Sequence, residues 1–319
     1  MEKILFIYNP NAGKGLIKEH LADVLTIISD AGYEMVVYPT KANKDAYEKV
    51  KNFTEDYARV ICSGGDGTLD EVVTGMMARN KRVPIGYIPA GTTNDFANSL
   101  EIPKDMIKAA QVAVDGEVFA CDVGNFNEDI FVYIAAFGLF TDVSYGTNQK
   151  VKNVLGHLAY VLEGATKLLD IPSYHMKVEV NGEVIEDDFM FGMVTNSRSV
   201  GGFKGMVGKD IVFDDGVFEV TLIKKPKNPI MLQEILAALV IEQIDTKYMY
   251  TFKTDRITFD VDEEIPWTLD GEFGGKHEDV VITNENKALK IMVPKEKEIV
   301  KVPIENEIMG VNEWTLVNK

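Results

Sequence analysis

The stretch Gly64-Gly65-Asp66-Gly67-Thr68 decides the fold of this chain, because it joins a strand-like run at residues 59–63 to a helical pattern at 68–79. Glycine adopts positive φ at low cost and lets the backbone come close to a phosphate. Amides at the following helix start supply donors and a favourable dipole for an anion. Asp66 adds a hard oxygen ligand for Mg²⁺. A plain turn in which Asp66 caps the helix is the alternative, but the corner favours nucleotide and metal binding, and therefore phosphoryl transfer.

Two further polar turns follow strand-like runs in the same way. Asn9-Pro10-Asn11-Ala12-Gly13 comes after residues 4–8, and Ala90-Gly91-Thr92-Thr93-Asn94-Asp95 comes after residues 84–88. The polar residues of the second turn also suit a helix start, so capping and ligand contact can coexist there. Lys14 follows the first turn and is a candidate phosphate-binding lysine. No G-x-x-x-x-G-K-[ST] pattern is present, so the turn is not a P-loop, and a surface lysine is an equally good interpretation.

Strands and helices alternate through the first third of the chain. Apolar runs at 4–8, 35–38, 59–63 and 84–88 read as strands, and helical patterns fall at about 17–31, 45–57 and 68–79. Such alternation predicts a doubly wound parallel sheet with helices on both faces. Ligands of these sheets bind outside the carboxyl ends of the strands. We therefore expect the three polar turns to meet at one edge.

The chain changes character after about residue 124, where short strand-like runs dominate. Turns such as Asn181-Gly182 and Asp214-Asp215-Gly216 suit antiparallel pairing, and two helices are expected near 155–169 and 230–244. The second helix is strongly apolar, which favours burial over membrane contact. We expect two domains: α/β at 1–124, with the tail at 295–319 packing back on it, and an antiparallel β-rich sandwich at 125–294. The strand-like runs are 131–137, 175–180, 189–194, 218–223, 256–260, 280–283 and 289–293.

Composition limits the partners and the compartment. The net charge is −17, from 33 basic and 50 acidic residues in 319, which argues against a nucleic-acid partner. Two cysteines, Cys62 and Cys121, lie in apolar runs and indicate a reducing compartment, not a disulfide framework. The opening apolar run is too short for a signal peptide. No apolar stretch approaches the roughly 18 residues of a membrane span. We expect a cytoplasmic protein.

Taken together, the motifs resemble those of the diacylglycerol kinase catalytic family, and of the soluble bacterial lipid kinases in particular. The resemblance covers nearly the whole chain. The glycine corner alone is shared with NAD kinases, but its combination with the second turn and the late Leu269-Asp270-Gly271-Glu272 is highly specific. The matching segments are 9–13, 63–69, 88–97, Asp122, Asn196 with Gly201-Gly202, 214–216 and 269–272.

The resemblance implies ATP bound between the two domains and a lipid hydroxyl as acceptor, with the second domain holding the lipid. Asp66, Asp95 and Asp122 would form an acidic network around phosphates, Mg²⁺ and water. A separate structural Mg²⁺ would lie at Asp215 with the main-chain oxygens of Val212 and Val217. The residues expected at the nucleotide are Asn9, Pro10, Asn11, Ala12, Gly13, Thr40, Gly65, Asp66, Gly67, Thr68, Leu69, Asp70, Glu71, Thr92 and Asn94.

The pair Asp270 and Glu272 matches the family's catalytic segment. Residues two apart in an extended segment share one face, so both carboxylates reach a common point. Glu272 is expected as the general base that takes the proton of the attacking hydroxyl, and Asp270 as its orienter or a metal contact. A solvated acidic turn is the alternative. Asp70 departs from the family pattern, which usually has Asn there, and an extra carboxylate near a triphosphate needs compensation.

The leading expectation is an ATP- and Mg²⁺-dependent lipid kinase that converts diacylglycerol to phosphatidic acid. It would visit the membrane surface transiently to reach its lipid, and a homodimer is compatible with the sequence. A sphingoid base or undecaprenol as acceptor, an NAD kinase, and a non-catalytic nucleotide- or metal-responsive binding protein are the alternatives. An intact set of acidic residues argues against the last.

Overall fold

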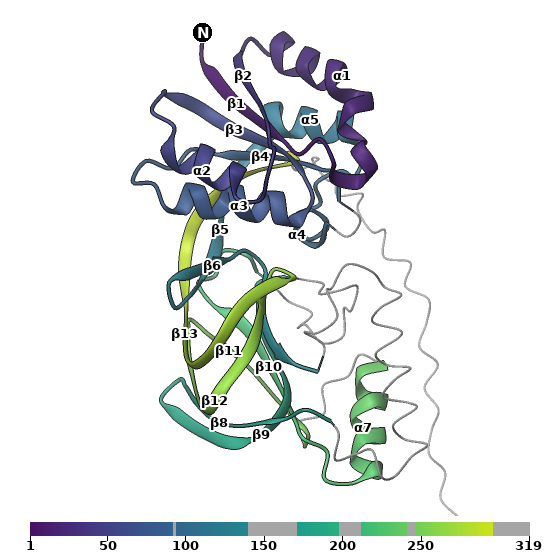
Figure 1. The fold of residues 1–319 in the computed structure, drawn as a ribbon, viewed down its shortest axis with the longest axis vertical. Coiled ribbons are helices and arrows are strands. Elements are labelled where there is room, and N and C mark those ends of the chain that lie inside the picture. The colour runs from purple at the N-terminus through teal and green to yellow at the C-terminus, as the bar shows by residue number, and fades with distance from the viewer. Residues whose placement is uncertain (92–93, 140–170, 198–211, 241–246, 296–319) are drawn as a thin grey trace, which may run out of the picture.

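The computed structural model describes residues 1–91, 94–139, 171–197, 212–240 and 247–295. These residues form two halves, one of mixed strands and helices and one built mainly of strands (Figure 1). A single 13-stranded sheet runs through both halves, in the path β11-β10-β9-β7-β12-β13-β4-β3-β1-β2. The two halves are therefore joined by hydrogen-bonded strands as well as by the chain.

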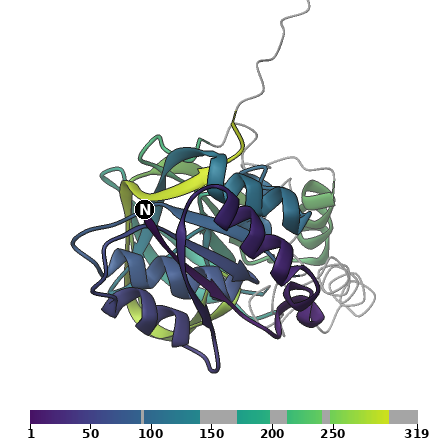
Figure 2. The same ribbon diagram turned by 90° about the horizontal axis from the view of Figure 1, so that it is seen from above.

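The N-terminal half is the expected doubly wound α/β unit. Its strands are parallel and lie in the order β2-β1-β3-β4. Helices α1 and α5 cover one face of this sheet, and α2 and α3 cover the other (Figure 2). The elements are β1 (Lys3–Tyr8), η1 (Ala12–Gly15), α1 (Ile17–Asp30), β2 (Glu34–Pro39), α2 (Asp45–Asn52), β3 (Tyr57–Gly64), α3 (Asp66–Met77), β4 (Ile85–Pro89), α4 (Asp95–Ser99) and α5 (Met106–Asp115).

The C-terminal half is antiparallel and β-rich, as predicted. Its core holds Phe126, Phe137, Phe259 and Trp267, whose rings meet edge to face at 4.8–5.8 Å between centroids. The elements are β5 (Glu117–Phe126), β6 (Asp129–Phe131), β7 (Ile134–Gly138), β8 (Tyr174–Val180), β9 (Glu183–Thr195), β10 (Phe218–Lys224), α7 (Pro229–Val240), β11 (Met249–Thr254), β12 (Arg256–Leu269) and β13 (Glu272–Val293).

Strand β13 passes from one half into the other. It pairs with β12 over most of its first part, with β5 further along, and with β4 through Ile291 and Ile85. The runs expected at 280–283 and 289–293 are thus one strand, with an irregularity between Glu285 and Leu289. The expected domain boundary at residue 124 falls inside β5, and the boundaries stay a prediction.

Several expected elements differ in extent. Helix α2 ends at Asn52, not near residue 57, because the backbone turns extended at Phe53 (φ −68°, ψ 139°) ahead of β3, which begins at Tyr57. Strand β12 continues nine residues beyond the expected end at 260. The expected helix at 155–169 lies outside the described residues, as does the tail beyond 295.

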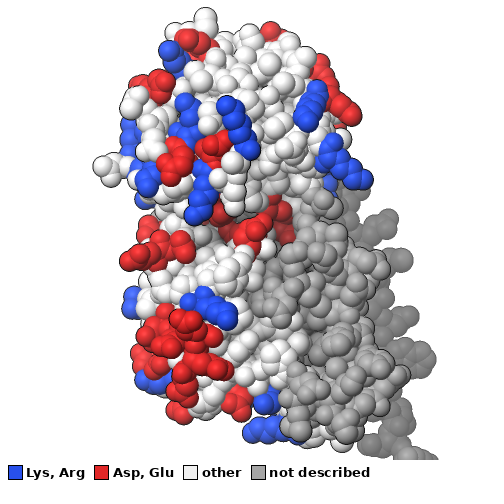
Figure 3. All heavy atoms as spheres, in the orientation of Figure 1, with Lys and Arg blue, Asp and Glu red and all other residues white. Residues whose placement is uncertain are grey.

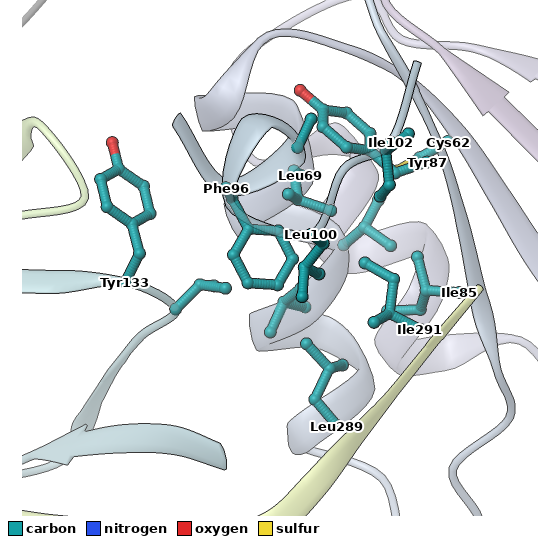
Figure 4. Packing of buried hydrophobic residues seen from close by; sticks show 14 of the residues in the cluster. Cys62, Leu69, Ile85, Tyr87, Phe96, Leu100, Ile102, Tyr133, Leu289 and Ile291 are labelled. Atoms are coloured by element: carbon teal, nitrogen blue, oxygen red, sulfur yellow. The ribbon is translucent and has the colours of Figure 1, made fainter. Parts of the chain in front are cut away.

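Buried apolar side chains anchor the loops of the N-terminal half. Leu69 from α3 and Phe96 from α4 lie in one cluster with Tyr87 of β4 and Leu289 of β13 (Figure 4). The apolar helix α7 also buries Leu232 and Ile235 fully, which agrees with packing against the protein. Within the described segments, no helix combines the length and the hydropathy needed to cross a bilayer.

Candidate active site

The polar turns meet at the carboxyl edge of the parallel strands, as their positions predict. The Asn9 amide donates to the Ser63 carbonyl at 2.9 Å, and the Ala90 amide donates to the Gly64 carbonyl at 2.8 Å. The Asn9 side chain also reaches the Thr68 hydroxyl at 3.5 Å. Thr40 joins the same edge, since its amide donates to the Tyr8 carbonyl at 2.9 Å.

Glycine is required where these turns touch. A Cβ on Gly13, whose φ is +54°, would lie 1.8 Å from the Ala90 carbonyl oxygen. A Cβ on Gly91 would lie 2.9 Å from the Gly65 Cα. The backbones of three loops therefore touch at Gly13 and Ala90 and at Gly91 and Gly65, and together form a tight cradle. This is the surface that a phosphate chain needs for close approach.

Asp66 is the first residue of α3, and its two carboxylate oxygens differ in their hydrogen bonds to the described residues. Its Oδ2 accepts the Asn94 amide at 3.1 Å, whereas its Oδ1 is buried and has no hydrogen-bond partner among the described residues. Burial raises the pKa of this carboxyl group above its ordinary value. A buried carboxylate oxygen that lacks a donor suits a divalent cation or a cation-bound water. The residues present thus fit Mg²⁺ at this corner.

Asn94 holds the second turn in shape. Its Oδ1 accepts the Gly91 amide at 3.0 Å, and its Nδ2 donates to the Gly91 carbonyl at 2.7 Å. The Asn94 backbone is left-handed, with φ of 51°. Its side chain is therefore occupied by the turn, and its backbone amide is the group that faces Asp66. Thr92, predicted at the nucleotide, lies outside the described residues.

The turn between β12 and β13 brings the C-terminal half to this corner. Asp270 is buried, and its carboxylate accepts the amides of Val132 at 2.5 Å, Tyr133 at 2.9 Å and Ile134 at 3.0 Å. Burial nevertheless raises the pKa of Asp270 to about 7. Glu272 is exposed, and its Oε1 lies 3.7 Å from the position of a Cβ on Gly67. The predicted base thus stands over the first turn of α3.

Several carboxyl groups gather around one tyrosine that the sequence did not single out. The Tyr133 hydroxyl donates to the Asp270 carbonyl at 3.0 Å. Burial and the charges of four carboxylates raise the pKa of Tyr133 well above its ordinary value. These carboxylates are Asp270, Asp66, Asp95 and Asp70. Acidic side chains are visible at the junction between the two halves (Figure 3). Tyr133 stands in an apolar run, so only the fold reveals its place.

Two predicted acidic residues are used structurally. Glu71 accepts the backbone amides of Lys44 at 2.8 Å and Ala46 at 3.0 Å, which ties α3 to the start of α2. Asp122 is fully buried and accepts four N–H donors at 2.7–3.3 Å. These donors are the amides of Gly216 and Lys287 and the side chains of Asn284 and Asn286. Asp122 is therefore already satisfied by protein groups, and its place in a metal network stays a prediction.

At the expected structural Mg²⁺ position, the Asp215 carboxylate forms an ion pair with Lys253. Asp215 Oδ1 accepts the Val217 amide at 3.2 Å, and its Oδ2 lies 3.5 Å from the Lys253 ammonium. Across the described ranges, no group of three His, Cys, Asp or Glu side chains is arranged to hold a metal ion. A second Mg²⁺ with Val212 and Val217 stays a prediction.

Comparisons with known proteins agree with this architecture. Residues 3–126 match the model of the diacylglycerol kinase catalytic domain, and residues 135–293 match a YegS C-terminal NAD kinase beta sandwich-like domain. A diacylglycerol kinase of Bacillus subtilis (strain 168) is 34% identical over 93% of this chain and 98% of its own. One from Staphylococcus carnosus (strain TM300) is 35% identical over 85% and 88%. A crystal structure of a diacylglycerol kinase from Bacillus anthracis str. Sterne superposes with a TM-score of 0.73 at 22% identity, over 92% of this chain and 97% of that one.

Proposed function

This chain belongs to the diacylglycerol kinase catalytic domain family of lipid kinases, and on that premise we propose that it transfers the γ-phosphoryl group of ATP to the free hydroxyl of diacylglycerol. The product would be phosphatidic acid. The observation that carries the proposal is the position of Glu272 over Gly67, beside the glycine corner. At this position a carboxylate of the C-terminal half lies next to the start of helix α3 in the N-terminal half.

The N-terminal half would hold the nucleotide. The glycine cradle and the amides at the start of α3 present donors to the triphosphate, and Asp66 would hold Mg²⁺ through its unpartnered oxygen, with Asp95 nearby. Bound Mg²⁺ supplies charge neutralisation on the phosphates. The turn after β1 at this edge contains Asn11 and Ala12, and the buried apolar cluster of this half contains Leu69.

Glu272 would then act on the acceptor. As the lipid oxygen attacks the γ-phosphorus, the bond to the bridging β–γ oxygen breaks and ADP leaves, while Glu272 takes the hydroxyl proton. A positioned carboxylate contributes about 10²–10⁴-fold to such a step. Asp270 is a positioning residue in this scheme, because three backbone amides occupy its oxygens. The same proposal includes transient binding of the protein to a lipid surface, where its substrate lies.

An NAD kinase is the second candidate, because the C-terminal half matches an NAD kinase beta sandwich-like model. The test is ATP-dependent phosphate transfer in mixed micelles with Mg²⁺, using diacylglycerol, a sphingoid base, undecaprenol and NAD as acceptors. We expect strong labelling of diacylglycerol. Labelling of another lipid alone would correct the acceptor, and labelling of NAD alone would overturn the lipid substrate.

The base is tested in the same assay with a matched pair of variants. We expect Glu272→Gln to lower kcat by about 10²–10⁴-fold without loss of thermal stability, because the side chain is exposed. Glu278→Gln removes another exposed carboxylate of the same strand and should retain full activity. Full turnover by Glu272→Gln would assign the proton to a different group.

A further inference from the structure

Tyr87 is a buried tyrosine whose hydroxyl group reaches two of the three polar turns from inside the protein. It lies in β4 opposite Cys62 of β3, and only 1% of its surface is exposed. Its ring belongs to the buried apolar cluster of the N-terminal half (Figure 4). The hydroxyl oxygen lies 3.1 Å from the Gly64 carbonyl oxygen and 3.3 Å from Asn94 Oδ1, and it can donate to either. One side chain therefore contacts both the glycine corner and the second turn.

Each of the two acceptors already takes one backbone amide. The Gly64 carbonyl accepts the Ala90 amide at 2.8 Å, and Asn94 Oδ1 accepts the Gly91 amide at 3.0 Å. The side-chain amide of Asn94 has a fixed orientation, because its Nδ2 donates to the Gly91 carbonyl at 2.7 Å. A carbonyl oxygen has two lone pairs, so each acceptor can take a second donor. The hydroxyl group carries a single proton, which it shares between the two turns.

The hydrogen bonds of the second turn continue to Asp66. The Asn94 backbone amide donates to Asp66 Oδ2 at 3.1 Å. Asn94 has a left-handed backbone, with φ of 51°, which residues other than glycine seldom adopt. Its side-chain hydrogen bonds hold that conformation in place. The two turns also touch, since a Cβ on Gly91 would lie 2.9 Å from the Gly65 Cα. A shift of the Asn94 side chain would therefore move the amide that holds the Asp66 carboxylate.

We propose that Tyr87 is a positioning residue of the nucleotide site: its hydroxyl group holds the glycine corner and the second turn together, and through Asn94 it sets the direction in which the Asp66 carboxylate faces its ligand. The part that Asp66 plays toward Mg²⁺ rests on the proposed function, whereas the contacts of Tyr87 do not. In the sequence, Tyr87 is one residue of a strand-like run at 84–88, where phenylalanine would fill nearly the same volume. The hydroxyl group is what distinguishes the two side chains.

The direct test is calorimetric titration of the full-length protein with a non-hydrolysable ATP analogue, in the presence and in the absence of Mg²⁺. We expect Tyr87→Phe to bind the analogue about tenfold more weakly than wild type when Mg²⁺ is present, less than the roughly 10²-fold of a full 1 Å displacement. Without Mg²⁺ the loss should be much smaller, because the misplaced group is the carboxylate that faces the metal. Equal affinities, or the same loss in both conditions, would overturn the proposal. No lipid enters this measurement.

Tyr57 provides a matched control in the same half. It is also 1% exposed, but its hydroxyl group has no hydrogen-bond partner among the described residues. Tyr57→Phe removes the same atom, so the nucleotide affinity should stay at the wild-type value in both conditions. Tyr87→Phe should also lower Tm by about 2–4 °C, and the titrations are made well below the Tm of either variant. An equal Mg²⁺-dependent loss in Tyr57→Phe would contradict a specific role for Tyr87.

Two further variants connect the effect to the hydrogen bond and to Asp66. An aminophenylalanine with its amino group in the para position, placed at residue 87, returns an N–H donor to the same point and should restore the Mg²⁺-dependent affinity. Failure of this rescue would remove the hydrogen bond as the cause. In an Asp66→Asn background, Tyr87→Phe should have little further effect, because residues that act through one another are not additive. Full additivity would overturn the path through Asn94 to Asp66.

The kinase assay separates this inference from the proposed function. We expect Tyr87→Phe to raise KM for ATP by about tenfold and to leave KM for diacylglycerol unchanged, since the displaced groups lie on the nucleotide side. An equal rise of both KM values would contradict the assignment. If wild type phosphorylates no lipid while the nucleotide affinities follow the expected pattern, the proposed acceptor is wrong and the role of Tyr87 is supported.

Discussion

At the scale of single residues, the site separates a carboxylate that is open to a ligand from carboxylates that hold the fold. Within the described part of the chain, Asp66 keeps a buried oxygen without a partner, whereas both oxygens of Asp122 accept hydrogen bonds from protein N–H groups. Sequence patterns treat the two alike, since each is an acidic residue that comes soon after an apolar run, although Asp66 follows β3 and Asp122 lies inside β5. What distinguishes them is which donors the fold brings to each one.

A substitution at Asp122 should therefore act on stability. Asp122→Ala leaves four part-buried donors from Gly216 and β13 without an acceptor, and a donor buried without a partner costs about 1–3 kcal/mol. We expect the free energy of unfolding in urea to fall by at least about 3 kcal/mol, with or without Mg²⁺. Asp262→Ala, an exposed aspartate on β12, should change it by less than about 0.5 kcal/mol. Normal stability with Mg²⁺-dependent loss of activity would instead place Asp122 in the metal network.

At the scale of elements, the site depends on loops that touch through backbone. Gly13→Ala would force the first turn away from Ala90, because the new Cβ would lie 1.8 Å from that carbonyl oxygen. We expect kcat/KM for ATP to fall by about 10²-fold, the usual effect of misplacing a binding group by about 1 Å. Gly32→Ala is the matched control: its φ is also positive, at +86°, but nothing lies within 4 Å of the new Cβ. It should lose some stability and keep its KM. Equal effects on KM would mean that backbone strain, and not contact, governs the cradle.

Elements also show where sequence reasoning succeeds and where it stops. The parallel strands and their polar turns follow local rules, so the edge that gathers Asn9, Asp66 and Asn94 was predictable. The length of β13 was not, because Asn284 and Asn286 interrupt its apolar pattern. Those side chains stay in the strand because they donate to Asp122. The three amides that bind Asp270 come from more than 130 positions away in the chain, and no local pattern announces such a contact.

At the scale of the whole molecule, β5 and β13 make the two halves mechanically continuous. Together they carry hydrogen bonds from the antiparallel half to Ile85 in the parallel half. Glu272 adds a second contact between the halves, since its Oε1 lies 3.7 Å from the position of a Cβ on Gly67. Two domains joined only by a linker unfold independently, but strands that belong to both cannot be lost from one half alone without breaking pairs in the other.

We therefore expect one unfolding transition for both halves. Trp267 is fully buried in the antiparallel core and reports on that half by fluorescence. Far-UV circular dichroism reports on helices, which lie mainly in the N-terminal half among the described residues. Measured on a Trp314→Phe background, so that Trp267 is the remaining tryptophan of the two, the probes should give coincident midpoints in urea. Loss of helical signal while Trp267 stays protected would show that the N-terminal half unfolds first. The shared strands would then join the halves in space without coupling their stability.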